Sequence, residues 1–251
     1  MTTSIMPGCE SFSSTGSSHG VLVLHGFTGN PQSMRPLAEA LANAGFTVEL
    51  PRLPGHGTTV EDMMTTTWAD WSSAAEAAYE SLAGRCEKVA IVGLSMGGAL
   101  TAYVGQRHDV DALVFINPIV KPAPDEDRAA IQLFIDAGVL VDVSIGSDIK
   151  KEGPKEASYD ATPLACALSL MNGLDDVYAH LTSLNAPTLL FTSREDHVVT
   201  DPINGDLLMS SVAAPIERVW LENSYHVATL DNDAAFLEAT TIAFLTRTLD
   251  A

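Results

Sequence analysis

Basic residues are scarce in this chain of 251 residues. Lysine and arginine together number 13, against 32 aspartates and glutamates, so the formal net charge at pH 7 is −19. Nucleic acids and anionic membrane surfaces are bound through basic patches, and this acidic balance therefore argues against both as partners. The excess of negative charge is better explained as a contribution to solubility.

Long apolar runs and paired cysteines are also missing. No apolar run reaches membrane-spanning length, and the first residues lack the basic and apolar regions of a secretion signal. We therefore expect a cytoplasmic protein without stable membrane insertion. Cys9, Cys86 and Cys166 are odd in number and widely spaced, which predicts free thiols, and no ligand spacing indicates a metal site. The hydrophobic content of 46% suits one sizeable domain with a full core.

One pentapeptide stands out, Gly-Leu-Ser-Met-Gly at positions 93–97. A β-branched run, 88–92, precedes it and a helix-compatible run, 99–104, follows it. A Gly-x-Ser-x-Gly sequence in this setting is typical of a tight turn that strains the backbone at the serine, here Ser95, and presents its hydroxyl at a helix N-terminus. Glycine-rich turns around a serine also arise by chance, so the motif requires catalytic partners.

Two later residues fit the acid and the base that such a nucleophile needs. Asp196 follows the apolar run 188–191, which places it at the carboxyl end of a predicted strand, where open α/β sheets carry their chemistry. His226 follows the predicted strand 216–221 and precedes the last helix. Aspartates in loops are more often turn or capping residues, and the position of Asp196 after a strand favours the catalytic interpretation.

Other residues compete for these two roles. If Asp196 is not the acid, a neighbour such as Glu195 is the next candidate. Only His226 has the expected place near the C-terminus, after the nucleophile and the acid. The competing histidines are His56, His108, His180 and His197.

A second glycine-spaced loop, His-Gly-Phe-Thr-Gly at 25–29, follows the apolar run 21–24. Acyl transfer requires two backbone N–H groups for the developing oxyanion, one of them from the residue after the nucleophile. We expect Met96 and Phe27 to supply them. His25 is expected to shape the loop rather than to transfer protons. The alternative interpretation is an ordinary strand-loop-helix connection.

These motifs, taken in chain order with Asp196 and His226, resemble the α/β-hydrolase fold serine esterases. The chain is similar, more narrowly, to small bacterial carboxylesterases and monoacylglycerol lipases, a likeness that includes Pro-Gly-His-Gly at 54–57. The likeness covers nearly the whole chain except 119–182, which corresponds to the family's variable cap. It implies hydrolysis of medium-chain acyl esters or monoacylglycerols through a Ser-His-Asp triad and an acyl-enzyme, without metal or organic cofactor.

The alternation of segments predicts an α/β fold, with a mostly parallel central sheet flanked by helices and a small inserted cap. Residues 1–118 and 183–251 are expected to form the core and 119–182 the cap, in a single domain overall. Strands are expected near 21–24, 46–50, 88–92, 112–116, 188–192 and 216–221, with room for an edge strand before residue 16. Helices are expected over 31–44, after a cap at Thr67, and over 233–249.

The inserted segment carries two predicted helices, at about 126–137 and from Pro163 onward. The second has an apolar stripe, and such stripes usually pack in a core, although at a cap interface one could also line an acyl pocket. The stripe consists of Leu164, Ala167, Leu168 and Met171. The candidate substrate-binding residues are Phe27, Ile119, Leu164, Leu168 and Met171. The charged cluster is expected to be a solvated loop and comprises Lys150, Lys151, Glu152, Lys155 and Glu156.

Similar sites on this fold cleave other bonds, so two alternatives stand beside ester hydrolysis. One is a lactone or carbon–carbon bond hydrolase, and the other is a ligand sensor that turns over slowly. Haloalkane and epoxide chemistry is disfavoured because those relatives carry an aspartate where this chain has Ser95. The expected partner is a small-molecule ester or lipid, and no feature of the sequence predicts an oligomeric state.

Overall fold

The fold is built on one large sheet in a computed structural model that describes residues 4–143 and 146–250. Its strands are β1 (Phe12–Ser14), β2 (His19–Leu24), β3 (Thr47–Leu50), β4 (Lys88–Leu94), β5 (Ala112–Ile116), β8 (Thr188–Ser193) and β9 (Ile216–Leu221). They lie in the order β1-β3-β2-β4-β5-β8-β9, and the neighbouring pairs are parallel except β1 with β3. The predicted, mostly parallel sheet is confirmed, and β1 is its antiparallel edge.

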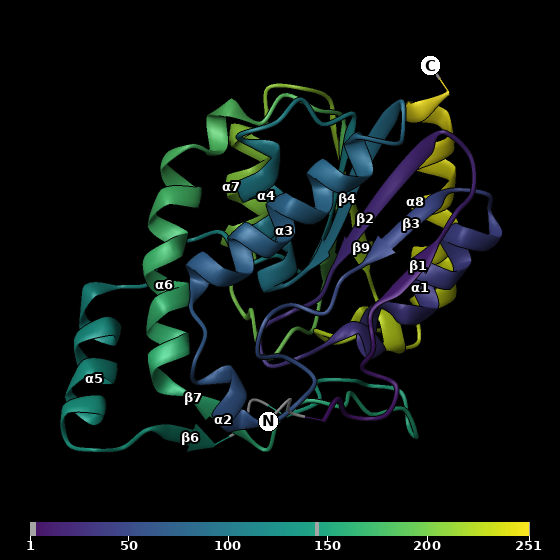
Figure 1. Ribbon diagram of the computed structural model, residues 1–251. Helices are drawn as coiled ribbons and strands as arrows, with labels where there is room; N and C mark the ends of the chain where they lie inside the picture. The colour runs from purple at the N-terminus through teal and green to yellow at the C-terminus, as the bar shows by residue number, and fades with distance from the viewer. Residues whose placement is uncertain (1–3, 144–145, 251) are drawn as a thin grey trace.

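Helices cover both faces of this sheet (Figure 1). One face carries α1 (Pro31–Asn43) and α8 (Ala234–Leu249), and the other carries α3 (Trp68–Ala83), α4 (Met96–Gly105) and α7 (Ile203–Ser211). Side chains alternate along each strand, so in β2 Val21 and Val23 pack into one core while Leu22 and Leu24 pack into the other. Because both faces are covered, the central strands are continuous apolar runs.

The predicted helix boundaries follow from their capping residues. The Asn30 side chain accepts a 2.9 Å hydrogen bond from the Gln32 N–H at the start of α1. Thr67 and Asp70 form a capping box at the start of α3, as the sequence indicated for Thr67. Gly45, with φ of +99°, follows α1 in a backbone conformation that favours glycine.

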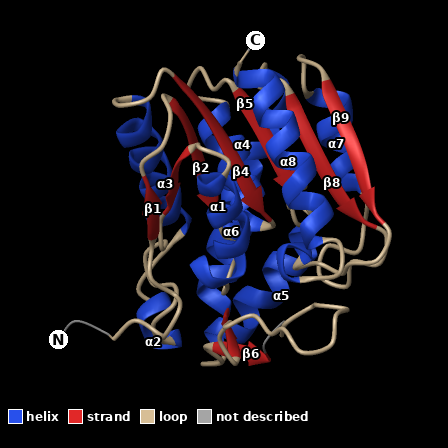
Figure 2. Cartoon of the chain, turned by 90° about the vertical axis from the view of Figure 1, so that its right-hand side faces the viewer, coloured by secondary structure: helices blue, strands red, loops and turns tan. Residues whose placement is uncertain are grey.

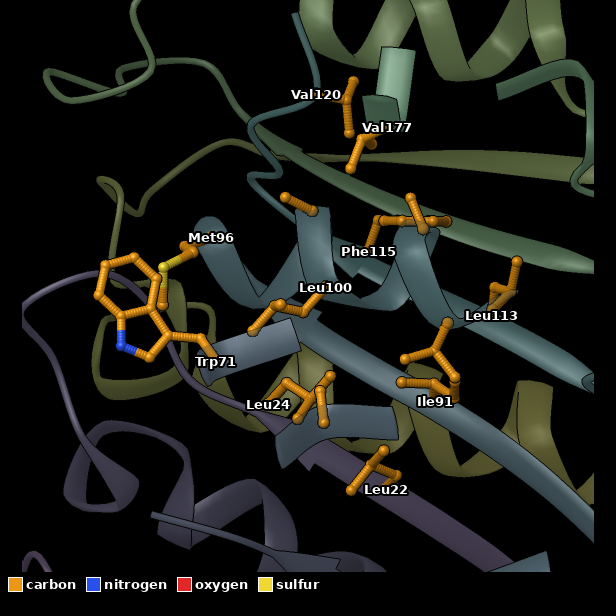
Figure 3. Close-up of a cluster of buried hydrophobic side chains, with 14 of the residues drawn as sticks. Leu22, Leu24, Trp71, Ile91, Met96, Leu100, Leu113, Phe115, Val120 and Val177 are labelled. Carbon is orange, nitrogen blue, oxygen red and sulfur yellow. The ribbon is translucent and has the colours of Figure 1, made fainter. Parts of the chain in front are cut away.

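The core beneath α3 and α4 extends to the end of the sheet where Ser95 lies (Figure 3). The side chains of Trp71 and Met96 are both fully buried there. The Trp71 indole N–H donates to the Thr66 hydroxyl at 3.0 Å and to the Pro54 carbonyl at 3.2 Å, so this large ring is fixed in place. The Met96 side chain anchors the first residue of α4 in this core.

The segment between β5 and β8 extends beyond the carboxyl ends of the parallel strands, toward which the strand arrows point in Figure 2. It contains α5 (Asp125–Asp136), the antiparallel pair β6 (Val141–Val143) and β7 (Ala161–Pro163), and α6 (Leu164–Ala179). Helix α6 packs against α3 and α4, whereas α5 contacts α6 and buries none of its residues. Both helices were predicted at nearly these positions; the β6–β7 pair and the short helix α2 (Val60–Met63) were not.

Two further expectations concern the surface and the thiols. No helix within the described residues is long and apolar enough to cross a membrane. Cys9, Cys86 and Cys166 are free thiols, as their spacing predicted. Burial raises the pKa of the Cys166 thiol to about 11, so this group is held as the neutral, unreactive form.

Candidate active site

Ser95 lies in the turn that joins β4 to α4. Its backbone has φ of +56° and ψ of −117°, a conformation that is strained for a residue with a side chain. The flanking glycines explain how the turn closes: a Cβ at Gly93 would lie 2.1 Å from the Gly97 carbonyl oxygen, and a Cβ at Gly97 would lie 2.2 Å from that of Leu24. The strand, the strained serine and the helix therefore occur as the pentapeptide predicts.

The loops after β8 and β9 bring Asp196 and His226 together. The distance between His226 Nδ1 and Asp196 Oδ2 is 2.8 Å, and both side chains are only 7% exposed. The other carboxylate oxygen, Asp196 Oδ1, accepts hydrogen bonds from the backbone N–H groups of Val198 at 2.9 Å and Val199 at 2.7 Å. The carboxylate is thereby fixed on one side while it holds the imidazole on the other.

The charge state of Asp196 follows from opposing effects. Burial is the largest effect and works against ionisation, but the hydrogen bond and charge of His226 favour the ionised form, as do the N–H groups of Val199 and Val198. Together these partners hold the pKa of Asp196 below its ordinary value. Asp196 is therefore the ionised partner of the imidazole at neutral pH.

Ser95 and His226 line one small cavity of about 40 Å³, together with Gly26, Phe27 and Glu156. The three residues proposed as a triad thus converge from three strand ends. Glu195, the alternative acid, points to the surface, where its 54% exposed side chain pairs with Lys150 at 3.2 Å. The competing histidines lie in other surroundings: His108 contacts Glu76, His180 contacts Asp176, His197 contacts Asp148, and His56 is buried against Trp71.

The 25–29 loop lies directly beside the nucleophile. A Cβ at Gly26 would be 3.4 Å from the Ser95 Cβ, and Phe27 follows it into the same cavity. Met96 is the first residue of α4, where a backbone N–H has no partner within the helix. Phe27 and Met96, the two predicted oxyanion donors, thus both lie next to Ser95, Phe27 across the cavity lining and Met96 along the chain.

His25 holds this loop in shape, as expected. Its Nδ1 lies 3.0 Å from the Gly26 carbonyl oxygen, and its Nε2 accepts a 3.1 Å hydrogen bond from the Leu53 N–H. Burial, reinforced by the nearby His56, lowers the pKa of His25 well below its ordinary value. A neutral ring that donates through Nδ1 and accepts through Nε2 satisfies both contacts, so His25 has a structural task here.

A second, larger cavity of about 390 Å³ opens from Ser95 toward the inserted segment. Its walls are mainly apolar and come from the 25–29 loop, the loop after β5, α5, β6, α6 and the loop after β8. Four of the five candidate substrate-binding residues line it, namely Phe27, Ile119, Leu164 and Met171. Leu168, the fifth, is not part of the lining that the described residues form; Ala167, Leu170 and Leu174 supply that face of α6. Helix α6 also packs in the core, where Leu164, Leu170 and Leu174 are buried, and of these three only Leu164 belongs to the predicted stripe.

Three polar residues of the site were not recognised from the sequence. Glu156 was expected in a solvated loop. This is wrong for its carboxyl group, which is buried in the cavity that His226 also lines and packs closely against the backbone of Gly29. Asn117 directs its side chain to the His226 loop, and Asp148 contacts the N–H of His226. Neither Glu156 nor Asp148 follows a strand of the main sheet, so strand-end position gives no signal for them.

Over residues 4–143 and 146–250, no group of three or more His, Cys, Asp or Glu side chains is arranged to hold a metal ion. The functional groups at the candidate site are a serine, a histidine and carboxylates, with the two predicted backbone donors beside them.

The chain belongs to the alpha/beta hydrolase family, whose model matches residues 21–239. The resemblance inferred from the motifs is thereby confirmed. The chain is 43% identical over 248 residues to the thermostable monoacylglycerol lipase of Bacillus sp. (strain H-257), covering 97% of this chain and 96% of that protein. It is 26% identical over 241 residues to a carboxylesterase of Bacillus subtilis (strain 168), covering 93% and 95% respectively.

Solved structures agree with this assignment. A structure from work on LipS and LipT, two metagenome-derived lipolytic enzymes, superposes with a TM-score of 0.92 at 42% identity, covering 97% of this chain and all of that one. A monoacylglycerol lipase from Paleococcus ferrophilus superposes with a TM-score of 0.72 at 16% identity, covering 95% and 98%. The second likeness shows the shared fold alone.

Proposed function

We propose that this chain hydrolyses carboxylic esters with Ser95 as nucleophile, His226 as base and Asp196 as acid. The observation that carries the proposal is the buried 2.8 Å contact between His226 Nδ1 and Asp196 Oδ2, next to the cavity that His226 shares with Ser95. Because Nδ1 is engaged by the carboxylate, Nε2 is the ring nitrogen available to the serine hydroxyl. The 43% identity to a monoacylglycerol lipase supports the same chemistry.

The reaction follows from this arrangement. His226 Nε2 takes the proton of the Ser95 hydroxyl as its oxygen attacks the ester carbonyl, and Asp196 stabilises the imidazolium that forms. The backbone N–H groups of Phe27 and Met96 bind the oxyanion; removing one such donor costs about 10²–10³ in rate in other enzymes. His226 then protonates the departing alcohol, and water hydrolyses the acyl-enzyme by the same route.

The two cavities at Ser95 differ in chemistry, which bears on the substrate. The larger one is apolar and suits an acyl chain, within the size range of small-molecule sites. The smaller one has the carboxyl group of Glu156 and the hydroxyl group of Thr28 on its walls. An alcohol with free hydroxyl groups would find hydrogen-bond acceptors there, so a medium-chain monoacylglycerol is the substrate class that fits best.

Hydrolysis of p-nitrophenyl esters from acetate to palmitate tests the reaction class, with wild type and Ser95→Ala assayed side by side. We expect rapid turnover at a medium chain length and its loss in Ser95→Ala, with an unchanged melting temperature. A folded wild type that hydrolyses none of these esters would contradict the proposal and favour lactone or carbon–carbon substrates. Near-native turnover by Ser95→Ala would exclude Ser95 as the nucleophile.

A matched substrate pair then tests the alcohol side. Monoacylglycerol and methyl ester of the same acyl chain share the acyl cavity and differ only in the leaving alcohol. We expect a higher kcat/KM for the monoacylglycerol in the wild type and a smaller preference in Glu156→Ala. Equal preference in the two proteins would separate Glu156 from alcohol recognition and leave the ester hydrolase assignment in place.

A further inference from the structure

The connection between β6 and β7 places the carboxylate of Asp148 between two loops, the one that carries Asp196 and the one that carries His226. Asp148 Oδ2 accepts a 3.0 Å hydrogen bond from the His226 backbone N–H and a 3.1 Å bond from that of His197. Its other oxygen, Oδ1, lies 2.8 Å from His197 Nδ1. The Asp148 side chain is only 12% exposed. Since His197 directly follows Asp196, this side chain contacts both loops at once.

We propose that Asp148 is a positioning residue, which holds the loops of Asp196 and His226 at the separation that their hydrogen bond requires. The inference rests on the proposed function, because it presupposes that these two residues serve Ser95. Asp148 acts through backbone groups and not on the substrate. It makes the inserted segment part of the machinery that aligns the triad.

The two loops need such a connection because they are separate parts of the chain. They leave neighbouring parallel strands, β8 and β9, and the residues that meet are 30 positions apart. The hydrogen bond between His226 and Asp196 is directional, so a shift of either loop lengthens or bends it. An ionised carboxylate that accepts from both loops forms charge-assisted bonds, which are stronger than neutral ones.

Asp148 is itself held in place. Its backbone carbonyl accepts a 3.0 Å hydrogen bond from the Val227 N–H, so the residue contacts the loop that carries His226 through main chain and side chain. Two and three positions further on, Lys150 and Lys151 donate their backbone N–H groups to the Asp231 carboxylate at 2.7 and 2.8 Å. Asp231 is 1% exposed and also accepts from the Tyr225 N–H. A carboxylate so anchored can fix the loops rather than follow them.

The experiment compares Asp148→Ala and Asp148→Asn with Asp160→Ala and Asp160→Asn, which change an exposed aspartate of the same inserted segment. The readouts are kcat and KM for the best ester, the melting temperature, and the strongly deshielded NMR signal of the His226 Nδ1 proton. The Asn variant keeps one acceptor oxygen and removes the charge. The Ala variant removes both oxygens.

We expect kcat of Asp148→Ala to fall on the order of 10²-fold, the effect that small misplacements of catalytic groups produce, with a much smaller change in KM. Asp148→Asn should fall less, and the deshielded proton signal should shift or broaden in both variants. The Asp160 variants should match the wild type. A role limited to overall stability would lower the melting temperature without changing kcat or this signal at temperatures where the variants are folded.

A kcat within twofold of the wild type and an unchanged proton signal in a folded Asp148 variant would overturn the inference. If Asp148→Ala does not fold, Asp148→Asn decides by the same two readouts. Failure of the proposed function has a different signature, in which the wild type lacks esterase activity or Ser95→Ala retains it. The proton signal of the Asp148 variants tests the positioning role in that case as well.

Discussion

The side-chain amide of Asn117 donates a 2.8 Å hydrogen bond to the backbone carbonyl of His226. Asn117 follows β5 and is 3% exposed, and its φ of +41° lies in the left-handed region that asparagine tolerates better than most residues. Its amide also donates to Ser193 Oγ at 2.9 Å, while its carbonyl oxygen accepts from the Ser193 N–H at 2.8 Å. One buried side chain thus connects the ends of three strands beneath the candidate triad.

Asn117→Ala should therefore lose both stability and catalytic rate. The buried partners left without a hydrogen bond cost about 1–3 kcal/mol, and the positive φ adds strain for alanine. We expect a lower free energy of unfolding in urea and a lower kcat. Asn117→Gly relieves the strain and removes the same hydrogen bonds, so the difference between the two variants reports the strain less the greater chain entropy of glycine in the unfolded state. Equal activity of Asn117→Ala and the wild type would contradict the role.

Asp196→Asn should reduce kcat by about 10⁴-fold, by analogy with the aspartate of other Ser-His-Asp triads, because the neutral amide no longer fixes the imidazole tautomer. Steady-state kinetics on one ester suffices to measure the loss. Glu195→Gln is the matched control, since that neighbouring carboxylate pairs with Lys150 at the surface. A small loss in Asp196→Asn combined with a large loss in Glu195→Gln would move the acid role to Glu195.

Glu156→Gln should raise stability at neutral pH. Burial is the main cause that raises the pKa of Glu156 in the folded state, against the opposing effects of Ser33 and His226. The folded state therefore binds this proton more tightly than the unfolded state, and stability falls as pH rises from the unfolded pKa toward the raised folded value. Glutamine removes this loss. The melting temperature of Glu156→Gln should exceed that of the wild type above this window and equal it at lower pH.

The control for this pH experiment is Glu152→Gln, in an exposed part of the same segment. Its melting temperature should follow that of the wild type at every pH. If the melting temperature of Glu156→Gln also equals that of the wild type at every pH, burial of the Glu156 carboxyl group does not destabilise the fold. If Glu156→Gln is more stable than the wild type and has a weaker preference for monoacylglycerol, the Glu156 carboxyl group serves substrate recognition at a cost in stability.

Ala167→Phe should shorten the preferred acyl chain. Ala167 is a small residue on the wall of the apolar cavity, and a phenyl ring there would occupy space that the acyl chain needs. The measurement is kcat/KM across the p-nitrophenyl ester series. Leu168→Ala, a change at the next residue of α6 outside the cavity lining, should leave the chain-length optimum unchanged. A shifted optimum in Leu168→Ala but not in Ala167→Phe would reverse the assignment of the α6 face.

The sequence predicted those parts of the molecule that depend on local pattern. The strands of the main sheet were recognisable as bounded apolar runs, and Ser95, Asp196 and His226 were predicted to act together because each follows a predicted strand. Asp148 and Glu156 reach the site from the inserted segment, where no regular element of the main sheet fixes their positions. Leu168 was predicted to line the larger cavity, whereas Leu170 lines it, because α6 also packs against α3 and α4 and the sequence pattern does not show which part of its apolar face meets the cavity.

The carboxylate of Asp231 has a consequence for how the inserted segment can move. Four backbone N–H groups donate to it, from Lys150, Lys151, Tyr225 and Asn232, and so join the middle of the insertion to the loop that carries His226. Helix α5 differs, since it buries none of its residues. Local unfolding begins where buried contacts are few. We therefore expect α5 to open more readily than the anchored residues 150–151.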